Sequence, residues 1–266
     1  PVLSFLKRWW RTRLPSIVRR WSGSLSSLAS PPPVTERNGF FITGTDTCVG
    51  KSEVTAALAA LIAHKGGSVF PRKPIESGCQ PNHQGERLFP ADGYMLQQAS
   101  QTADSLETVT PYRFEPALSP ELAARNSGTT ITLQQLVTAC ETPMATEQDR
   151  VLVEGAGGFY SPIAEQALNA DLAVALGLPV ILVAEDRLGA INQTLLARHA
   201  ILSHGLTLAA IILNQQQQQQ PDNGNLASIQ KRVTELVIPL PFTVCGSAPW
   251  MELRKQLEPT FSALYR

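Results

Sequence analysis

The chain has 266 residues, of which 43% are hydrophobic and 17% charged, enough for one large α/β domain or two small ones with a sizeable core. Its net charge is zero, yet six of its 22 basic residues and no acidic residue lie within residues 1–30. The remainder is mildly acidic, with 16 basic and 22 acidic residues, which argues against a nucleic-acid binder. No run of about 18 apolar residues suggests a transmembrane helix. The four cysteines form no CxxC pair and are expected to be free thiols.

Residues 1–37 form a basic extension that we treat separately from the domain 38–266. Its apolar residues recur at helical spacing with arginines between them, and a Ser- and Pro-rich stretch follows. This pattern is typical of a membrane-surface helix or of an organelle-targeting leader. Pro15 interrupts the helix, which favours the alternative of a weakly ordered extension. We expect a cytoplasmic protein, or an organelle-targeted one if the extension is a leader.

From Gly39 onward, short apolar runs alternate with helical stretches. The predicted strands are 40–42, 68–70, 151–153, 180–184 and 208–213. The predicted helices are 51–64, 91–98, 120–125, 133–142, 190–203, 227–236 and 251–264. The strands are too continuously apolar to be half exposed, so helices should cover both faces of the sheet. The sequence predicts a single, doubly wound α/β domain with a mostly parallel sheet, and a polar surface loop at Gln215–Gln220.

The first predicted strand leads into a glycine-rich loop, Gly44 to Ser52, and an apolar helix follows at once. Strand, loop and helix in this order are the context of a phosphate-binding loop, as in P-loop NTPases. Backbone N–H groups and the helix end hold phosphate oxygens, Lys51 neutralises them, and the Ser52 hydroxyl can ligate Mg²⁺. Five residues separate Gly44 from Gly50, one more than in the common pattern. We predict that this loop binds a nucleoside triphosphate.

Two further charged residues follow predicted strands. Glu154 precedes three glycines and an alanine at the carboxyl end of a strand, where a second Mg²⁺ ligand is expected; the alternative is a turn with a solvated Glu154. Lys73 follows the second strand, which we expect to lie next to the first and so beside the loop. There it could stabilise charge on a transferring phosphoryl group, although a lone lysine in such a place is otherwise a surface residue.

Several segments match one family in order. They are 44–52, 73–78, 91–92, 111–114, 119–120, 153–158 and 188–192. Together they resemble the dethiobiotin synthetases, ATP-dependent ligases of biotin biosynthesis whose phosphate loop carries the extra residue. The resemblance implies that 7,8-diaminopelargonic acid takes up CO₂ as a carbamate, which ATP converts to a carbamic-phosphoric anhydride. The second amine then closes the ring to dethiobiotin and releases phosphate.

The resemblance also implies roles for individual residues. Lys73, Lys51 and Thr47 would be catalytic, and Ser52, Asp92 and Glu154 would hold Mg²⁺. The implied ATP-binding residues are Cys48, Val49, Gly50, Lys51, Ser52, Glu53, Asp92, Glu154, Gly155, Ala156, Gly157, Asn214, Gln215, Ser247, Ala248 and Pro249. The implied substrate-binding residues are Thr47, Ser77, Leu188, Gly189 and Asn192. The last three would act across the interface of a homodimer.

The sequence departs from the family pattern at two places, and one alternative function remains. Cys48 stands where the family commonly has glutamate, and the adenine-side segment has Cys245 and Ala248 for the usual Leu and Ile. The alternative function is a switch ATPase of the partitioning or division-site kind, held on a membrane by residues 1–37. Such proteins carry a second lysine early in the phosphate loop. Thr45 occupies that position here, which argues against the alternative.

Overall fold

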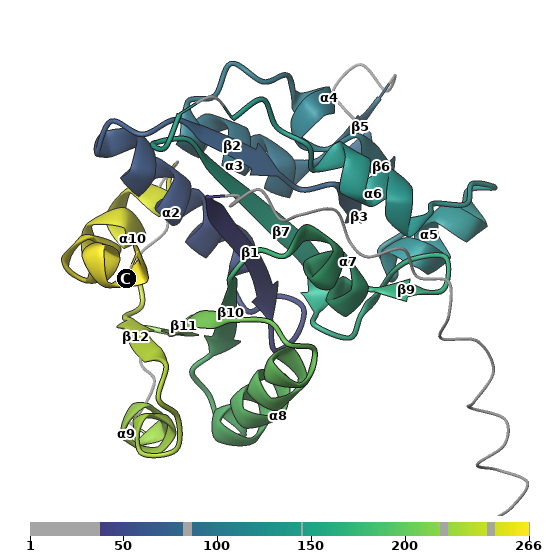
Figure 1. The fold of residues 1–266 in the computed structure, drawn as a ribbon. Coiled ribbons are helices and arrows are strands. Elements are labelled where there is room, and N and C mark those ends of the chain that lie inside the picture. Colours follow the sequence, from purple (N-terminus) through teal and green to yellow (C-terminus); the bar gives the residue numbers. More distant parts are fainter. Residues whose placement is uncertain (1–37, 82–86, 145, 219–222, 244–247, 266) are drawn as a thin grey trace, which may run out of the picture. The chain divides into compact units, whose positions relative to one another are not determined.

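The computed structural model of the chain describes residues 38–81, 87–144, 146–218, 223–243 and 248–265 (Figure 1). The predicted extension 1–37 and the predicted site residue Ser247 lie outside these ranges, as do Cys245 and part of the glutamine-rich loop. None of the helices in these ranges combines the length and the apolar character that a membrane span requires. Cys48 and Cys79 are free thiols, as predicted.

The centre of the fold is a six-stranded sheet (Figure 1). Its strands run in the order β12 (Leu236–Leu240), β11 (Leu208–Asn214), β10 (Val180–Glu185), β1 (Gly39–Gly44), β7 (Arg150–Gly158) and β2 (Val69–Arg72). All neighbouring pairs are parallel, so the carboxyl ends of the strands meet at one edge of the sheet. In this register Ile42 of β1 lies between Glu154 of β7 and Ile181 of β10.

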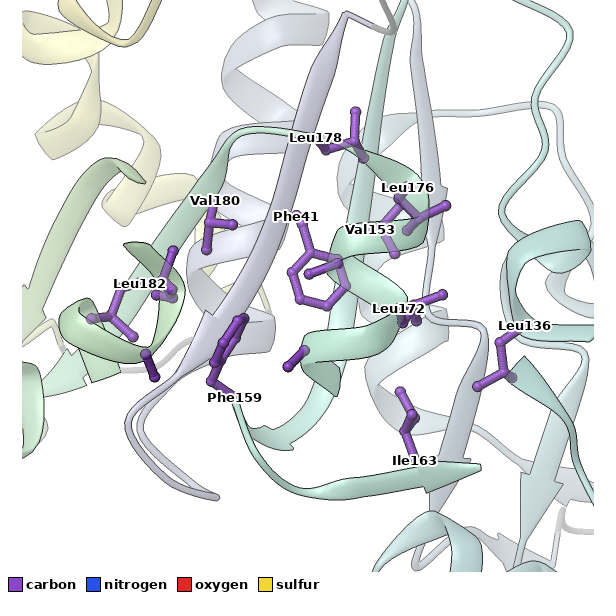
Figure 2. Packing of buried hydrophobic residues seen from close by; sticks show 14 of the residues in the cluster. Phe41, Leu136, Val153, Phe159, Ile163, Leu172, Leu176, Leu178, Val180 and Leu182 are labelled. Atoms are coloured by element: carbon purple, nitrogen blue, oxygen red, sulfur yellow. The ribbon is translucent and has the colours of Figure 1, made fainter. Parts of the chain in front are cut away.

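Helices cover both faces of the sheet, which confirms the doubly wound prediction. One core cluster joins the sheet to α2 (Lys51–His64), α3 (Ala91–Ser100) and α10 (Trp250–Leu257), and the other joins it to α7 (Asn169–Leu176) and α8 (Ala190–Ser203). Strand β1 serves both clusters because successive side chains point to opposite faces. Phe40 and Ile42 pack toward α2, whereas Phe41 packs in the cluster of α7 and α8 (Figure 2).

Shorter elements complete the described ranges. The remaining helices are α4 (Leu106–Val109), α5 (Pro120–Asn126), α6 (Leu133–Ala139), α9 (Asn225–Gln230) and the 3₁₀ helix η1 (Glu258–Tyr265). Three small sheets pair β3 (Ile75–Ser77) with β6 (Tyr112–Phe114), β4 (Gln80–Pro81) with β5 (Leu88–Phe89), and β8 (Pro162–Ala164) with β9 (Ala167–Leu168). The bounds of α2 and α8 are those predicted from the sequence.

The region after β11 corrects the prediction. The expected helix 227–236 ends at Gln230, and the apolar residues Leu236–Leu240 form strand β12 instead. Pro239 has no N–H to donate to a neighbouring strand, but β12 is an edge strand and needs no donor on its outer side. The expected helix 251–264 ends at Leu257, where the chain continues as η1. Helix α7 is not among the predicted helices.

The expected neighbourhood of the first two strands is also wrong. Strand β7 lies between β1 and β2, so β2 is the other edge of the sheet. Lys73, directly after β2, therefore reaches the phosphate loop across the end of β7, where Glu154 lies. The sequence pattern gives the strands but not their spatial order, because each crossover helix can return the chain to either side.

Candidate active site

The loop between β1 and α2 packs closely against the end of β11. Gly50 has a φ of 88°, a left-handed conformation that favours glycine. A Cβ atom on Gly50 would lie 2.2 Å from Nδ2 of Asn214. That Nδ2 donates a hydrogen bond to the carbonyl oxygen of Val49 over 3.1 Å. Both the backbone and the buried Asn214 therefore require glycine at position 50.

Lys51, the first residue of α2, points back across the loop. Its Nζ donates a hydrogen bond to the carbonyl oxygen of Asp46 over 2.8 Å. Burial and then the nearby cation Lys73 lower the pKa of Lys51 to about 8. A polyanion placed between the two lysines would stabilise both ammonium groups. The Asp46 carboxylate accepts a hydrogen bond from the N–H of Thr47, so this side chain bonds within the loop.

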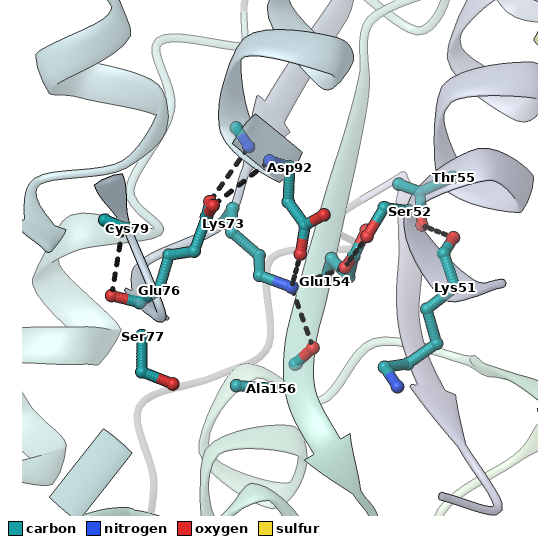
Figure 3. Close-up of polar contacts among 12 residues, drawn as sticks. Lys51, Ser52, Thr55, Lys73, Glu76, Ser77, Cys79, Asp92, Glu154 and Ala156 are labelled. Atoms are coloured by element: carbon teal, nitrogen blue, oxygen red, sulfur yellow. Dashed lines mark hydrogen bonds and ion pairs between the residues drawn. The ribbon is translucent and has the colours of Figure 1, made fainter. Parts of the chain in front are cut away.

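Lys73 is held between two carboxylates (Figure 3). Its Nζ lies 2.5 Å from Oε1 of Glu154 and 3.0 Å from Oδ2 of Asp92, and the Ser52 hydroxyl donates to the same Glu154 oxygen over 2.8 Å. Burial alone would lower the pKa of Lys73, but Asp92 and Glu154 raise it above its usual value. The structure thus brings four predicted residues together and keeps Lys73 charged.

Glu76 belongs to this cluster, although sequence reasoning assigned it no role. Its two carboxylate oxygens accept hydrogen bonds from the N–H groups of Asp92 (3.1 Å) and Gly93 (3.0 Å), at the start of α3. Burial and the charge of Asp92 raise the pKa of Glu76 to about 7. Glu76 therefore fixes the helix end that carries Asp92. The only signal in the sequence was its place in the segment 73–78, which matches the family.

A second overlooked residue, Asn169, shapes the glycine segment after Glu154. The fully buried Asn169 accepts from the N–H of Ala156 over 3.1 Å and donates to the carbonyl oxygens of Ala156 and Gly158 over 2.6 and 2.9 Å. The left-handed φ of 77° at Gly157 allows the turn that these bonds require. Asn169 is the first residue of the unpredicted helix α7, and no sequence pattern connects it with this segment.

Two cavities are lined by predicted site residues. The first, which we call the loop cavity, has a volume of about 380 Å³. It is lined by predicted residues 47, 48 and 50–53 of the loop, by Lys73, Ser77, Asp92, Ala156 and Gly157, and also by Glu76. The second, which we call the β11–β12 cavity, has a volume of about 230 Å³. Predicted residues Glu53, Asn214, Gln215 and Pro249 line it, together with Pro241, Phe242, Thr243 and Leu253, which the sequence did not indicate.

The remaining predicted residues lie elsewhere. Glu154 and Gly155 are buried beside the loop cavity, where the Gly155 carbonyl oxygen lies 3.5 Å from Nζ of Lys73. Val49 is buried in the core, and Ala248 accepts a hydrogen bond from the N–H of Met251 at the start of α10. Leu188, Gly189 and Asn192 are exposed at the start of α8 and line neither cavity. Within one chain, these three predicted substrate-binding residues are therefore not part of the cavity that Lys51 and Lys73 line.

The first strand of the parallel sheet runs through a glycine-rich loop into a helix that begins with a lysine and a serine. This arrangement defines a P-loop nucleotide-binding protein. In agreement, residues 38–256 match the sequence profile of a family described as "AAA domain". The putative plasmid partition protein of Borrelia burgdorferi B31, solved with AMPPNP, superposes with a TM-score of 0.51 at 10% identity, covering 85% of this chain and 99% of that one. This likeness shows the fold alone.

The curated relatives define the family more narrowly. The ATP-dependent dethiobiotin synthetase of Anaeromyxobacter sp. (strain Fw109-5) is 45% identical over 177 residues, which are 66% of this chain and 76% of the relative. That of Ruthia magnifica subsp. Calyptogena magnifica is 42% identical over 177 residues, 66% and 79% of the two chains. The chain belongs to the dethiobiotin synthetase family, and it is an ATP-dependent ligase.

Proposed function

We propose that this chain converts 7,8-diaminopelargonic acid, CO₂ and ATP into dethiobiotin, ADP and phosphate. The observation that carries the proposal is the pair of lysines lining one cavity, Lys51 from the phosphate loop and Lys73 from the end of β2. A carbamate and a triphosphate are both anions, so bringing them together needs cations and positioning more than an acid or a base. The names of the relatives support the same reaction.

In this proposal the nucleotide spans both cavities. Its phosphates lie in the loop cavity at the start of α2, where backbone N–H groups and Lys51 face them. Its base lies in the β11–β12 cavity between apolar side chains such as Phe242 and Pro249. Because Nδ2 of Asn214 already donates to Val49, the amide oxygen of Asn214 would accept from the adenine amino group.

We assign Mg²⁺ to Ser52, Asp92 and Glu154. Oε2 of Glu154 is buried and has no hydrogen-bond partner within the described ranges, so a cation would supply the partner that this oxygen lacks. Hydroxyl and carboxylate oxygens suit Mg²⁺. Among the residues that the structure describes, no group of three His, Cys, Asp or Glu side chains is arranged to hold a metal ion, so further ligands such as phosphate oxygens would be needed. When bound, Mg²⁺ neutralises charge on the phosphates.

The chain's own residues would act on the diamine in turn. One amine adds to CO₂ and loses a proton, and Lys73 holds the resulting carbamate. The carbamate oxygen attacks the γ-phosphorus while Lys51 and Lys73 stabilise the charge that moves to the leaving ADP. The second amine then attacks the carbonyl carbon and expels phosphate. The Ser77 hydroxyl donates a hydrogen bond to the carbonyl oxygen of Leu118 over 2.7 Å, so the Ser77 hydroxyl oxygen can still accept one from an amine. The hydroxyl oxygen of Thr47, which lines the same cavity, can do the same.

The purified chain should release phosphate only when the diamine, bicarbonate, Mg²⁺ and ATP are all present. Omission of any one, or addition of EDTA, should reduce phosphate release to background, and mass spectrometry should find one dethiobiotin for each phosphate. Phosphate release that ignores the diamine would contradict the ligase reaction and favour a switch ATPase. The relatives' names and Thr45 in the loop already weigh against that alternative.

We also propose a homodimer in which Leu188, Gly189 and Asn192 hold the substrate carboxylate of the partner at the start of α8. Apolar residues are exposed here: Leu188, just before this helix, is 87% exposed, and Leu196 within it is 62% exposed. Such side chains are commonly covered in an interface. Leu196→Glu should convert a sedimenting dimer into a monomer and raise the KM for the diamine.

The matched control is Met251→Glu, since Met251 is 49% exposed on α10, which covers the other face of the sheet. That variant should remain a dimer. A wild-type monomer at micromolar concentration would exclude the proposed interface.

A further inference from the structure

The two cavities share a boundary formed by two side chains. Glu53 and Gln216 are the lining residues common to the loop cavity and the β11–β12 cavity among the described residues. In a nucleoside triphosphate the ribose joins the base to the phosphates. With phosphates in one cavity and base in the other, as proposed above, the ribose lies at this boundary. Glu53 and Gln216 are thus the side chains beside the sugar.

Glu53 has an unused carboxylate at this boundary. It is half-buried in the first turn of α2, and no described residue forms a hydrogen bond or an ion pair with its oxygens. Its Oε2 lies 3.3 Å from the position that a Cβ atom on Gly50 would take, which places the carboxylate against the loop. By contrast, the amide nitrogen of Gln216 donates to the carbonyl oxygen of Cys48 over 2.7 Å.

The chemistry of the boundary is that of hydrogen-bond acceptors. The Glu53 carboxylate and the remaining amide oxygen of Gln216 both accept. A carboxylate repels phosphate, so the part of the nucleotide beside Glu53 must be uncharged and must donate. The ribose hydroxyls meet both conditions. We infer that Glu53 binds the ribose hydroxyls of the nucleotide and makes the enzyme prefer ribonucleotides to deoxyribonucleotides.

This inference rests on the proposed placement of the nucleotide and is tested by direct binding, without the diamine. For the wild type, the Kd of 2′-deoxy-ATP or of 3′-deoxy-ATP should exceed that of ATP by roughly tenfold or more, as expected for a hydrogen bond to a charged acceptor. In Glu53→Ala the difference should fall below about twofold. Glu53→Gln keeps an acceptor oxygen and should retain part of the preference for ATP.

Glu121→Ala is the matched control, because Glu121 is also an acidic residue in the first turn of a helix, α5, but lines neither cavity. It should leave the preference unchanged. Glu53→Ala with the wild-type preference, or a wild type that binds all three nucleotides equally, would overturn the inference. Equal weakening of all three nucleotides by Glu53→Ala would also overturn it, since Glu53 would then only stabilise α2. Failure of diamine-dependent phosphate release would instead refute the proposed reaction. The comparison of nucleotide Kd values would still test the role of Glu53, because it does not depend on the diamine.

Discussion

Lys73→Ala should lower diamine-dependent phosphate release by a factor of roughly 100 to 1000, the range for removal of one preorganised group that stabilises transition-state charge. The Lys73 ammonium lies between Asp92 and Glu154 and lines the loop cavity, where we propose that the phosphates bind. Without this ammonium, only Lys51 remains of the two lysines that would stabilise the charge developing during phosphoryl transfer. ATP binding, measured by calorimetry without the diamine, should persist because Lys51 and the loop N–H groups are unchanged.

The variant also leaves two carboxylates without their shared cation, which destabilises a buried site by roughly 3 to 5 kcal/mol. Lys73→Arg therefore accompanies it: the charge is kept, but a planar guanidinium does not replace a compact ammonium, so turnover should still fall. Lys65→Ala is the surface control, since Lys65 is exposed and pairs with Glu258 over 2.7 Å. Normal turnover in Lys73→Ala would exclude Lys73 from the site.

Phe41→Ala should lower the free energy of unfolding by about 3 to 5 kcal/mol, measured by urea denaturation followed by circular dichroism. Phe41 is fully buried in the centre of β1 and packs in the cluster with α7 and α8 (Figure 2). Its ring also approaches the glycine segment, because a Cβ atom on Gly155 would lie 3.1 Å from Cζ of Phe41. The cavity left by alanine should therefore loosen this segment and reduce turnover of the protein that stays folded.

The matched control is Phe89→Ala, since Phe89 is 38% exposed and contacts Tyr94 at a ring distance of 5.1 Å. Its loss should cost less than about 1 kcal/mol. A comparable loss in both variants would show that burial in the cluster does not set the contribution of Phe41.

Local sequence patterns predicted most of the sheet. Five strands stand out as continuous apolar runs, and α2 and α8 have the predicted bounds because each is a long helix that follows a loop with glycine. The sixth strand, β12, was hidden by Pro239, which is tolerated only because the strand lies at an edge. The order of strands depends on packing between distant segments, and no local pattern carries it.

In the candidate site, too, some residues could be predicted from local sequence motifs and others could not. Lys51, Ser52, Lys73, Asp92 and Glu154 lie in motifs, and the structure brings them together. The roles of Glu76 and Asn169 arise from hydrogen bonds to backbone groups that folding places beside them. A side chain that shapes another segment has no signature of its own in the sequence. The motifs thus predicted the groups that face the cavity better than those that hold them in place.

Gly50 and Asn214 compete for one small space, although they are 164 positions apart in the chain. A side chain at position 50 would clash with that amide and would also be strained by the left-handed backbone, so a change at position 214 would not by itself admit one. Loss of the Asn214 amide would in turn leave the carbonyl oxygen of Val49 without its donor. Glycine at position 50 and asparagine at position 214 are therefore each expected to persist among homologues, and the end of β11 limits what the phosphate loop can become.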